Sequence, residues 1–364
     1  MRPARPSAAP RLGHVATLDV LRFGAAAAVL VYHYLYRGAA PPPITATSFD
    51  GGEWVRHLYL AVHLFFAISG FVIMASVRDR DAVGFAAARF VRLWPAYAIC
   101  AAVTLLIVHA TGDPRFPASW AQWAANLTFV APALGQPFAD GAYWSIVVEL
   151  VFYAWVAVMI LLRVLPRHTL AFAATWLVLS TLNEAWWDAE ALRRLAATRY
   201  APWFVFGMVG HHLVVRGPSV AAWGLGAAAV ALSMHHGVVE QAEIALGYAA
   251  QPDPTGIALA NAAVLAVFAL AVRFRAALRP RPWLLALGAL TYPLYLLHQH
   301  IGYIALDALA PALGKHMGVA LTAAGVLLLA WAVERFAERP ARRALRRGVD
   351  AALAPVAQIR RRMA

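Results

Sequence analysis

The 364-residue sequence contains one cysteine, one lysine and few charged residues for its length. A single cysteine, Cys100, excludes an intramolecular disulfide and any metal site built from several thiolates. Because Cys100 lies in an apolar run, we expect a small buried hydrophobic residue rather than a nucleophile. Charged residues make up 13% of the chain, against about 25% in soluble domains, which excludes an ordinary soluble protein.

The chain also lacks a Walker loop and a GxGxxG sequence, so neither of these modes of nucleotide binding is indicated. Two pairs of adjacent histidines, His211-His212 and His235-His236, have side chains that diverge on a helix. Neither pair resembles a set of metal ligands, and we predict no metal.

What the chain does contain is apolar sequence, since 62% of its residues are hydrophobic. Runs of about twenty apolar residues recur, each long enough to cross a bilayer. They lie at 15–36, 55–77, 93–111, 142–162, 168–183, 200–215, 219–236, 255–272, 283–305 and 317–337. The sequence therefore predicts an all-α membrane protein with about ten transmembrane helices.

The net charge of +13 follows from arginines that concentrate in alternate connections between these runs. The positive-inside rule places those connections, and both termini, in the cytoplasm. We therefore predict a cytoplasmic segment at 1–14, a transmembrane domain at 15–340 and a basic cytoplasmic tail at 341–364 that lies on membrane lipids. This distribution explains the positive charge without a nucleic-acid partner.

The first apolar run contains Asp19, Arg22 and His33. An ionisable side chain at membrane depth costs at least about 2.5–3.5 kcal/mol, so a functional role is expected. Eleven helical residues make three turns plus about 20°, which puts Arg22 and His33 on one face about 16 Å apart. Asp19 is spaced to pair with Arg22. The alternative is that Arg22 snorkels to the surface and His33 caps the far end.

Polar residues also interrupt the second run and the connection that follows it. His63 lies in the outer half of the second run, and is either packed or pore-lining, whereas the Ser69-Gly70 pair lies deeper. A small pair of this kind usually indicates close helix packing. Arg89 and Arg92 then align along one helix edge. They either mark a cytoplasmic connection, as membrane topology requires, or bind an anionic phosphate ligand.

Two later runs carry polar residues at membrane depth. Glu149 lies about 10 Å below the outer boundary of its run and needs a partner, and His33 in the same half is one candidate. In the ninth run Pro293 is expected to open the helix and free backbone groups, and Tyr292, Tyr295 and His298 lie at a similar depth.

Taken in order, these pieces resemble the acyltransferase-3 family, integral membrane enzymes that modify bacterial envelope polysaccharides and related glycans. The matching motifs are Leu18-Asp19-x-Leu21-Arg22 with His33, Phe65-Phe66-x-x-Ser69-Gly70, Arg89-x-x-Arg92-x-x-Pro95, Trp144-Ser145 with Glu149 and Phe152-Tyr153, Arg199 with Phe204-x-Phe206-Gly207, Thr291-Tyr292-Pro293-Leu294-Tyr295-Leu296-Leu297-His298, and Glu338-x-Pro340. Seven collinear motifs across residues 18–340 are specific together. The sequence departs from the family at Thr291, often a serine, and at His63, often an aspartate.

The resemblance implies an enzyme of the bacterial inner membrane that uses acyl-CoA, typically acetyl-CoA, as a co-substrate and has no tightly bound cofactor. The acceptor is a hydroxyl of a glycan or lipid-linked glycan, and His33 is its general base or a transient acyl carrier. We expect three groups of site residues: catalytic His33, Glu149, Arg22, Asp19 and His298; donor-binding Arg89, Arg92, Ser69, Gly70 and Arg78; and His63, Trp144, Tyr292 and Tyr295 along the acceptor path.

A transporter of a small anionic or sugar-like solute is the alternative, because polar residues within membrane helices also describe a substrate path. Against it, the sequence shows no repeated pattern of broken helices in corresponding halves.

Overall fold

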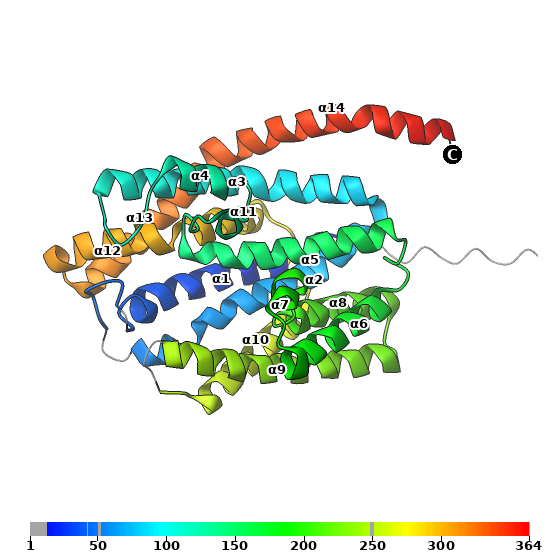
Figure 1. Cartoon of the computed structure of the whole chain (residues 1–364), viewed down its shortest axis with the longest axis horizontal. Coiled ribbons are helices and arrows are strands. Elements are labelled where there is room, and N and C mark those ends of the chain that lie inside the picture. The colour runs from blue at the N-terminus through cyan, green and yellow to red at the C-terminus, as the bar shows by residue number, and fades with distance from the viewer. Residues whose placement is uncertain (1–12, 42, 50–51, 248–250, 364) are drawn as a thin grey trace, which may run out of the picture.

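A computed structural model of the chain describes residues 13–41, 43–49, 52–247 and 251–363, and these form helices and loops without a β-strand (Figure 1). The helices are α1 Ala16–Tyr32, α2 Ala61–Ser76, α3 Ala82–Thr111, α4 Trp120–Asn126, α5 Trp144–Leu161, α6 Thr169–Leu182, α7 Glu190–Ala196, α8 Ala201–Arg216, α9 Val220–Gly247, α10 Pro254–Arg273, α11 Pro282–Leu297, α12 Gln299–Leu313, α13 Lys315–Ala332 and α14 Arg339–Met363. The all-α prediction is confirmed.

Seven helical segments of the described chain are long and apolar enough to cross a membrane. They are 16–37, 58–76, 82–111, 141–161, 220–247, 254–273 and 315–355, and α11 is a shorter apolar helix. Each of the ten predicted runs contains a helix, but α6 and α8 have only 14 and 16 residues. A count of ten spans and cytoplasmic termini therefore stay predictions, and nearly all of the predicted segment 1–14 lies outside the described residues.

The α2–α8 contact is the closest helix approach that bears on the site. A Cβ atom added at Gly70 would collide with the backbone of Phe204, and one at Gly207 would collide with the carbonyl of Ala67. Only glycine lets the two backbones approach this closely, as small residues do in membrane helix pairs generally. The packing interpretation of Gly70 is confirmed, and α2 is fixed in rotation about its axis.

The helix interruption in the ninth run lies at His298, not at Pro293 as predicted. Helix α11 continues through Pro293 to Leu297, and α12 begins at Gln299. His298, at the junction, is completely buried. The junction is held by Tyr34, whose hydroxyl donates to the carbonyl of His298 at 2.7 Å. Gly302 leaves the space that the Tyr34 ring occupies.

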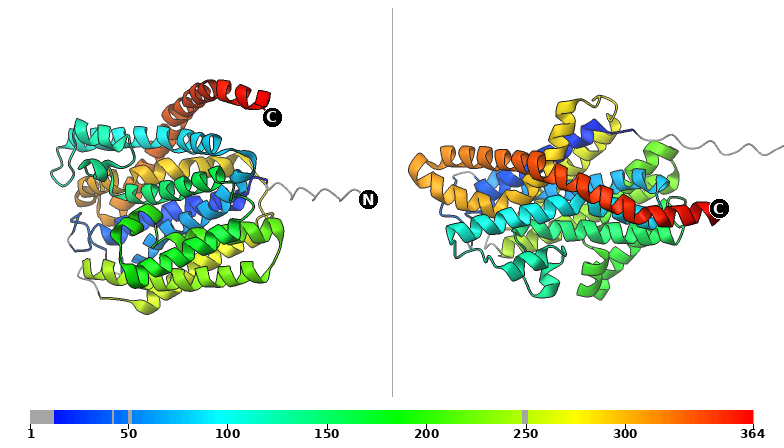
Figure 2. Two further views of the ribbon diagram at one scale, coloured as in Figure 1. Left: turned by 45° about the vertical axis from the view of Figure 1, so that its right-hand side comes forward. Right: turned by 90° about the horizontal axis from the view of Figure 1, so that it is seen from above.

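The basic C-terminal segment is continuous with the transmembrane domain. A π-helical stretch, Val333–Glu338, joins α13 to α14, so no break separates residues 340 and 341. Ion pairs of Arg339 with Glu334 and of Arg342 with Glu338 fix the start of α14. The helix packs on α3, and both views in Figure 2 show it running along the outside of the bundle.

Candidate active site

A cavity of about 590 Å³ lies between α1, α2, α3, α5, α11 and the first turns of α14. This volume is within the range of small-molecule sites. At one end it is lined by residues at the starts of α1, α3 and α11, and at the other by the start of α5 and the end of α11. Its charged lining residues are seven arginines and two carboxylates: Arg22, Arg80, Arg89, Arg92, Arg342, Arg343, Arg346, Asp19 and Glu149.

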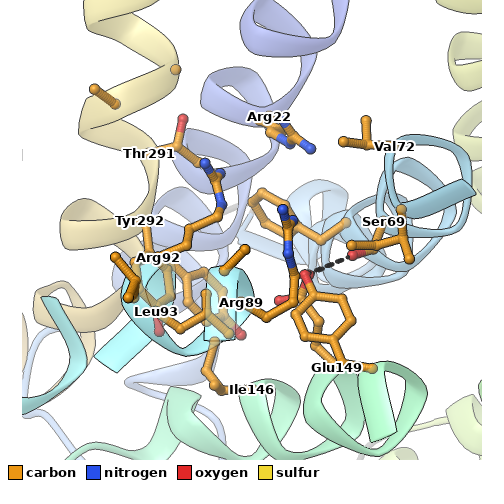
Figure 3. A pocket seen from close by; sticks show the side chains of 18 of the residues that line it. Arg22, Ser69, Val72, Arg89, Arg92, Leu93, Ile146, Glu149, Thr291 and Tyr292 are labelled. Atoms are coloured by element: carbon orange, nitrogen blue, oxygen red, sulfur yellow. Dashed lines mark hydrogen bonds between the residues drawn. The ribbon is translucent and has the colours of Figure 1, made fainter. Parts of the chain in front are cut away.

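Three of the arginines, Arg22, Arg89 and Arg92, converge on the cavity from α1 and α3 (Figure 3). Arg22 lies 3.6 Å from Asp19, which confirms the predicted pair. Arg89 and Arg92 form no ion pair with any residue that the structure describes, and Nε of Arg89 is buried without a hydrogen-bond partner there. Because buried donors are nearly always paired, this arrangement suits an anionic ligand.

Glu149 faces these arginines from α5. The hydroxyls of Ser69 and Tyr153 both donate to Glu149 Oε1, and the Ser69–Glu149 bond is dashed in Figure 3. Ser69 comes from α2, so this bond crosses the cavity wall between two helices. The partly buried Glu149 carboxylate thus has hydrogen-bond partners, but they differ from the predicted candidate, His33.

The deep end of the cavity carries hydroxyl groups instead of charges. The hydroxyls of Ser145 and Tyr295 lie 2.7 Å apart, and the Phe65 ring packs 5.6 Å from the Tyr295 ring. Thr291 and Tyr292 line the same side from α11. The Tyr292 hydroxyl is buried and has no hydrogen-bond partner among the described residues.

A histidine pair lies directly behind Tyr295. Nδ1 of His298 is 2.7 Å from the Tyr295 carbonyl oxygen, and Nε2 of His298 is 3.1 Å from Nδ1 of His33. Nδ1 of His33 is also 2.9 Å from the Val29 carbonyl oxygen. Carbonyl oxygens only accept hydrogen bonds, so we assign the proton of each neutral ring to Nδ1.

This tautomer assignment leaves one ring nitrogen available. The single Nδ1–H of His33 is shared between the Val29 carbonyl and Nε2 of His298, whereas Nε2 of His33 makes no hydrogen bond in the described part of the chain. The His33 side chain is partly exposed. A neutral imidazole with an accessible Nε2 lone pair has the chemistry of a general base or a nucleophile.

Six of the predicted site residues do not line this cavity: His33 and His298 lie behind Tyr295, and the other four lie elsewhere. His63 lies 3.0 Å from Glu240 of α9 and stacks on Trp203, and the Trp144 ring packs against Tyr200. Arg78 lines a separate space of about 20 Å³ beside α8, and Gly70 lies in the α2–α8 contact. Tyr292 and Tyr295 do line the cavity, but His63 and Trp144 do not.

Several cavity residues were not among the predicted site residues: Arg80, the α14 arginines, and Ser145 and Tyr153, which were noted only as parts of motifs. Arg339, Arg342, Arg343 and Arg346 follow the i, i+3, i+4, i+7 spacing of a single helix face. That periodicity marks an arginine-rich face, but it does not indicate that the face turns toward the bundle.

Comparison with known proteins identifies the family. A family model described as "Acyltransferase domain" matches residues 15–335. The chain belongs to the acyltransferase-3 family. A curated relative, acyltransferase MdmB of Streptomyces mycarofaciens, is 27% identical over 155 residues, which are 40% of this chain and 38% of that protein. No protein of known structure matches significantly. With its apolar helices, this member of the family is a multi-pass membrane protein and a transferase.

Proposed function

We propose that this acyltransferase moves an acyl group, in the simplest case acetyl, from cytoplasmic acyl-CoA to a hydroxyl of an envelope or exported glycan in the bacterial inner membrane. One observation carries the proposal. A cavity that contains unpaired arginines ends at Tyr295, whose carbonyl oxygen holds the His298–His33 pair.

The arginines supply what the donor needs. CoA is a polyanion, and planar guanidinium groups bind phosphate through two parallel hydrogen bonds. Arg89 and Arg92 would bind the diphosphate, and Arg22 would neutralise further charge. Beyond them the lining becomes uncharged, which suits the pantetheine arm and the thioester. The arm would extend from Arg22 along α1 toward His33, which follows the end of that helix, a distance of about 16 Å.

The deep end would hold the reacting carbonyl. The Tyr295 and Ser145 hydroxyls are the nearest donors for the oxyanion that develops on the thioester oxygen. His298 is less suited to that role, because its Nδ1 proton is directed to Tyr295 and its Nε2 accepts from His33. We therefore assign His298 to orienting His33.

His33 would then move the proton. Its Nε2 takes the proton of the acceptor hydroxyl while the hydroxyl oxygen attacks the thioester carbon. A C–O bond forms, the C–S bond breaks, and the leaving thiolate takes the proton from the His33 imidazolium. The same Nε2 would serve the second route, in which His33 carries the acyl group between donor and acceptor.

The two routes differ in one measurable product. Purified protein incubated with radiolabelled acetyl-CoA and no acceptor, then denatured, retains label on His33 only if the histidine is an acyl carrier. A His33→Ala variant is the blank. Absence of label in the wild-type protein is the result that direct transfer requires.

The donor assignment is tested by binding of acetyl-CoA to the detergent-purified protein. The double variant Arg89→Ala, Arg92→Ala should bind at least tenfold more weakly, because hydrogen bonds to a charged group contribute about 1.5–3 kcal/mol each. Arg167→Ala, an exposed arginine away from the cavity, is the matched control. Undiminished binding by the double variant would show that these arginines serve only membrane topology.

A further inference from the structure

The arginines of α14 contribute to the cavity although they follow the family-matched segment 15–335. Arg342, Arg343 and Arg346 line the cavity together with Arg80, which precedes α3. Helix α3 begins at the right-hand end of Figure 1, the end toward which α14 extends. These side chains therefore surround the end of the cavity where α3 begins, and we call this group of residues the mouth.

The arginines at the mouth are not equivalent. Arg342 lies 2.8 Å from the buried Glu338 carboxylate, so its charge is already compensated and it anchors the helix. Arg343 and Arg80 have no ion-pair partner in the part of the chain that the structure describes. Arg346 lies 3.7 Å from Asp350, but both side chains are largely exposed, and such pairs contribute little. Three guanidinium groups are thus available to a ligand.

The lining of the cavity changes in a fixed order from the mouth inward. Arg80 comes just before α3, and Arg89 and Arg92 lie about 10 and 15 Å from the first residue of that helix, while Arg343 and Arg346 reach the cavity from α14. The uncharged deep end at Ser145 and Tyr295 is last. A ligand that fills this cavity needs anionic groups at two successive levels, followed by an uncharged arm.

CoA has that order of groups, with a ribose 3′-phosphate, a diphosphate and then pantetheine. The 3′-phosphate is a monoester, which carries about −1.5 to −2 charge at pH 7 and three acceptor oxygens. A cluster of exposed arginines matches that group, whereas each phosphate of the diphosphate carries less charge. This match rests on the proposed function, in which acyl-CoA is the donor.

We infer that Arg343 and Arg346 of α14, together with Arg80, bind the ribose 3′-phosphate of the donor. The C-terminal helix would then select CoA thioesters over thioesters that carry pantetheine without the nucleotide. It would do so without touching the reacting atoms, so its residues determine specificity and take no part in the chemistry.

The experiment compares binding of acetyl-CoA and acetyl-3′-dephospho-CoA to the full-length protein in detergent. Wild-type protein should bind the dephospho donor at least tenfold more weakly. The double variant Arg343→Ala, Arg346→Ala should lose affinity for acetyl-CoA to the same level, while its affinity for the dephospho donor stays unchanged. Arg343→Lys, Arg346→Lys should restore part of the preference, and Arg347→Ala, on the same helix but outside the cavity, should behave as wild type.

Equal affinity of the wild-type protein for both donors would overturn the inference without any variant, so a misfolded variant cannot hide the result. Equal losses of affinity for both donors in the Ala variant would also overturn it. The arginines would then attract anions through their overall positive potential and would not recognise the 3′-phosphate. Failure of the wild-type protein to bind acetyl-CoA at all would contradict the proposed function instead.

Discussion

Nε2 of His298 lies 3.1 Å from Nδ1 of His33, although 265 residues separate them in the sequence. Each Nδ1 also lies next to a backbone carbonyl, that of Tyr295 for His298 and that of Val29 for His33. These two carbonyls orient the rings and leave Nε2 of His33 without a hydrogen-bond partner in the part of the chain that the structure describes. Tyr295 lines the end of the donor cavity, and its carbonyl oxygen positions His298, which in turn contacts the proposed base, His33.

His298 is therefore expected to act by positioning His33. His298→Ala should lower kcat by about 10- to 100-fold and leave KM for the acyl donor nearly unchanged, since the donor-binding arginines are intact. His298→Gln should recover part of the lost rate, because its amide can still accept from His33. Steady-state kinetics of the three proteins provide the check. A rise in KM with unchanged kcat would instead place His298 in donor binding.

Gly70 is expected to matter through packing against α8. Gly70→Ala places a methyl group against the Phe204 backbone and should destabilise the fold by about 1–3 kcal/mol. Gly224→Ala on α9 meets no neighbouring atom and is the control. Thermal unfolding in detergent measures both. A Gly70→Ala protein of normal stability that fails to bind acetyl-CoA would contradict this and support the predicted role of Gly70 in donor binding.

The sequence predicts where the long helices lie along the chain, but it does not predict how each helix is rotated about its axis. Hydropathy and arginine counts are local properties, so the all-α class and the position of each helix follow from them. Ser145 faces the cavity while its neighbour Trp144 packs against Tyr200, because adjacent helical residues point about 100° apart. On α2, His63 lies about 240° around the helix from Ser69, so it does not face the cavity that Ser69 lines.

Residue spacing also predicts which side chains pair within one helix, but it does not predict contacts between helices. The Asp19–Arg22 pair follows from a three-residue separation and is present. The His33–His298 pair and the approach of α14 to α3 depend on how distant segments pack, which no pattern in a single sequence encodes. Arg343 and Arg346 were therefore expected in a tail on the membrane surface rather than at a cavity.

Asp253 is expected to make the stability of the fold depend on pH in the acidic range. Hydrogen bonds from His57 and the Gly256 amide, and the nearby Arg56 guanidinium, lower the pKa of the Asp253 carboxyl below its ordinary value of about 3.9. The ionised form is thus favoured by folding, and its contribution is present above pH 4 and lost as the pH falls further.

The melting temperature of the wild-type protein should therefore fall as the pH drops below about 4, and Asp253→Asn should show a shallower fall. Asp350→Asn, an exposed residue of α14, is the control. Identical slopes for wild-type and Asp253→Asn proteins would show that this carboxyl contributes no pH dependence.

The role of His33 is tested most directly by the ester-linked acyl groups of surface glycan in the native host. His33→Ala should abolish them while the protein level and the binding of acetyl-CoA to the purified variant stay normal, because the donor cavity does not include His33. His109→Ala, an exposed histidine at the end of α3, should leave them intact. Wild-type amounts of esters from His33→Ala at a normal protein level would contradict the assignment of His33 as base or acyl carrier.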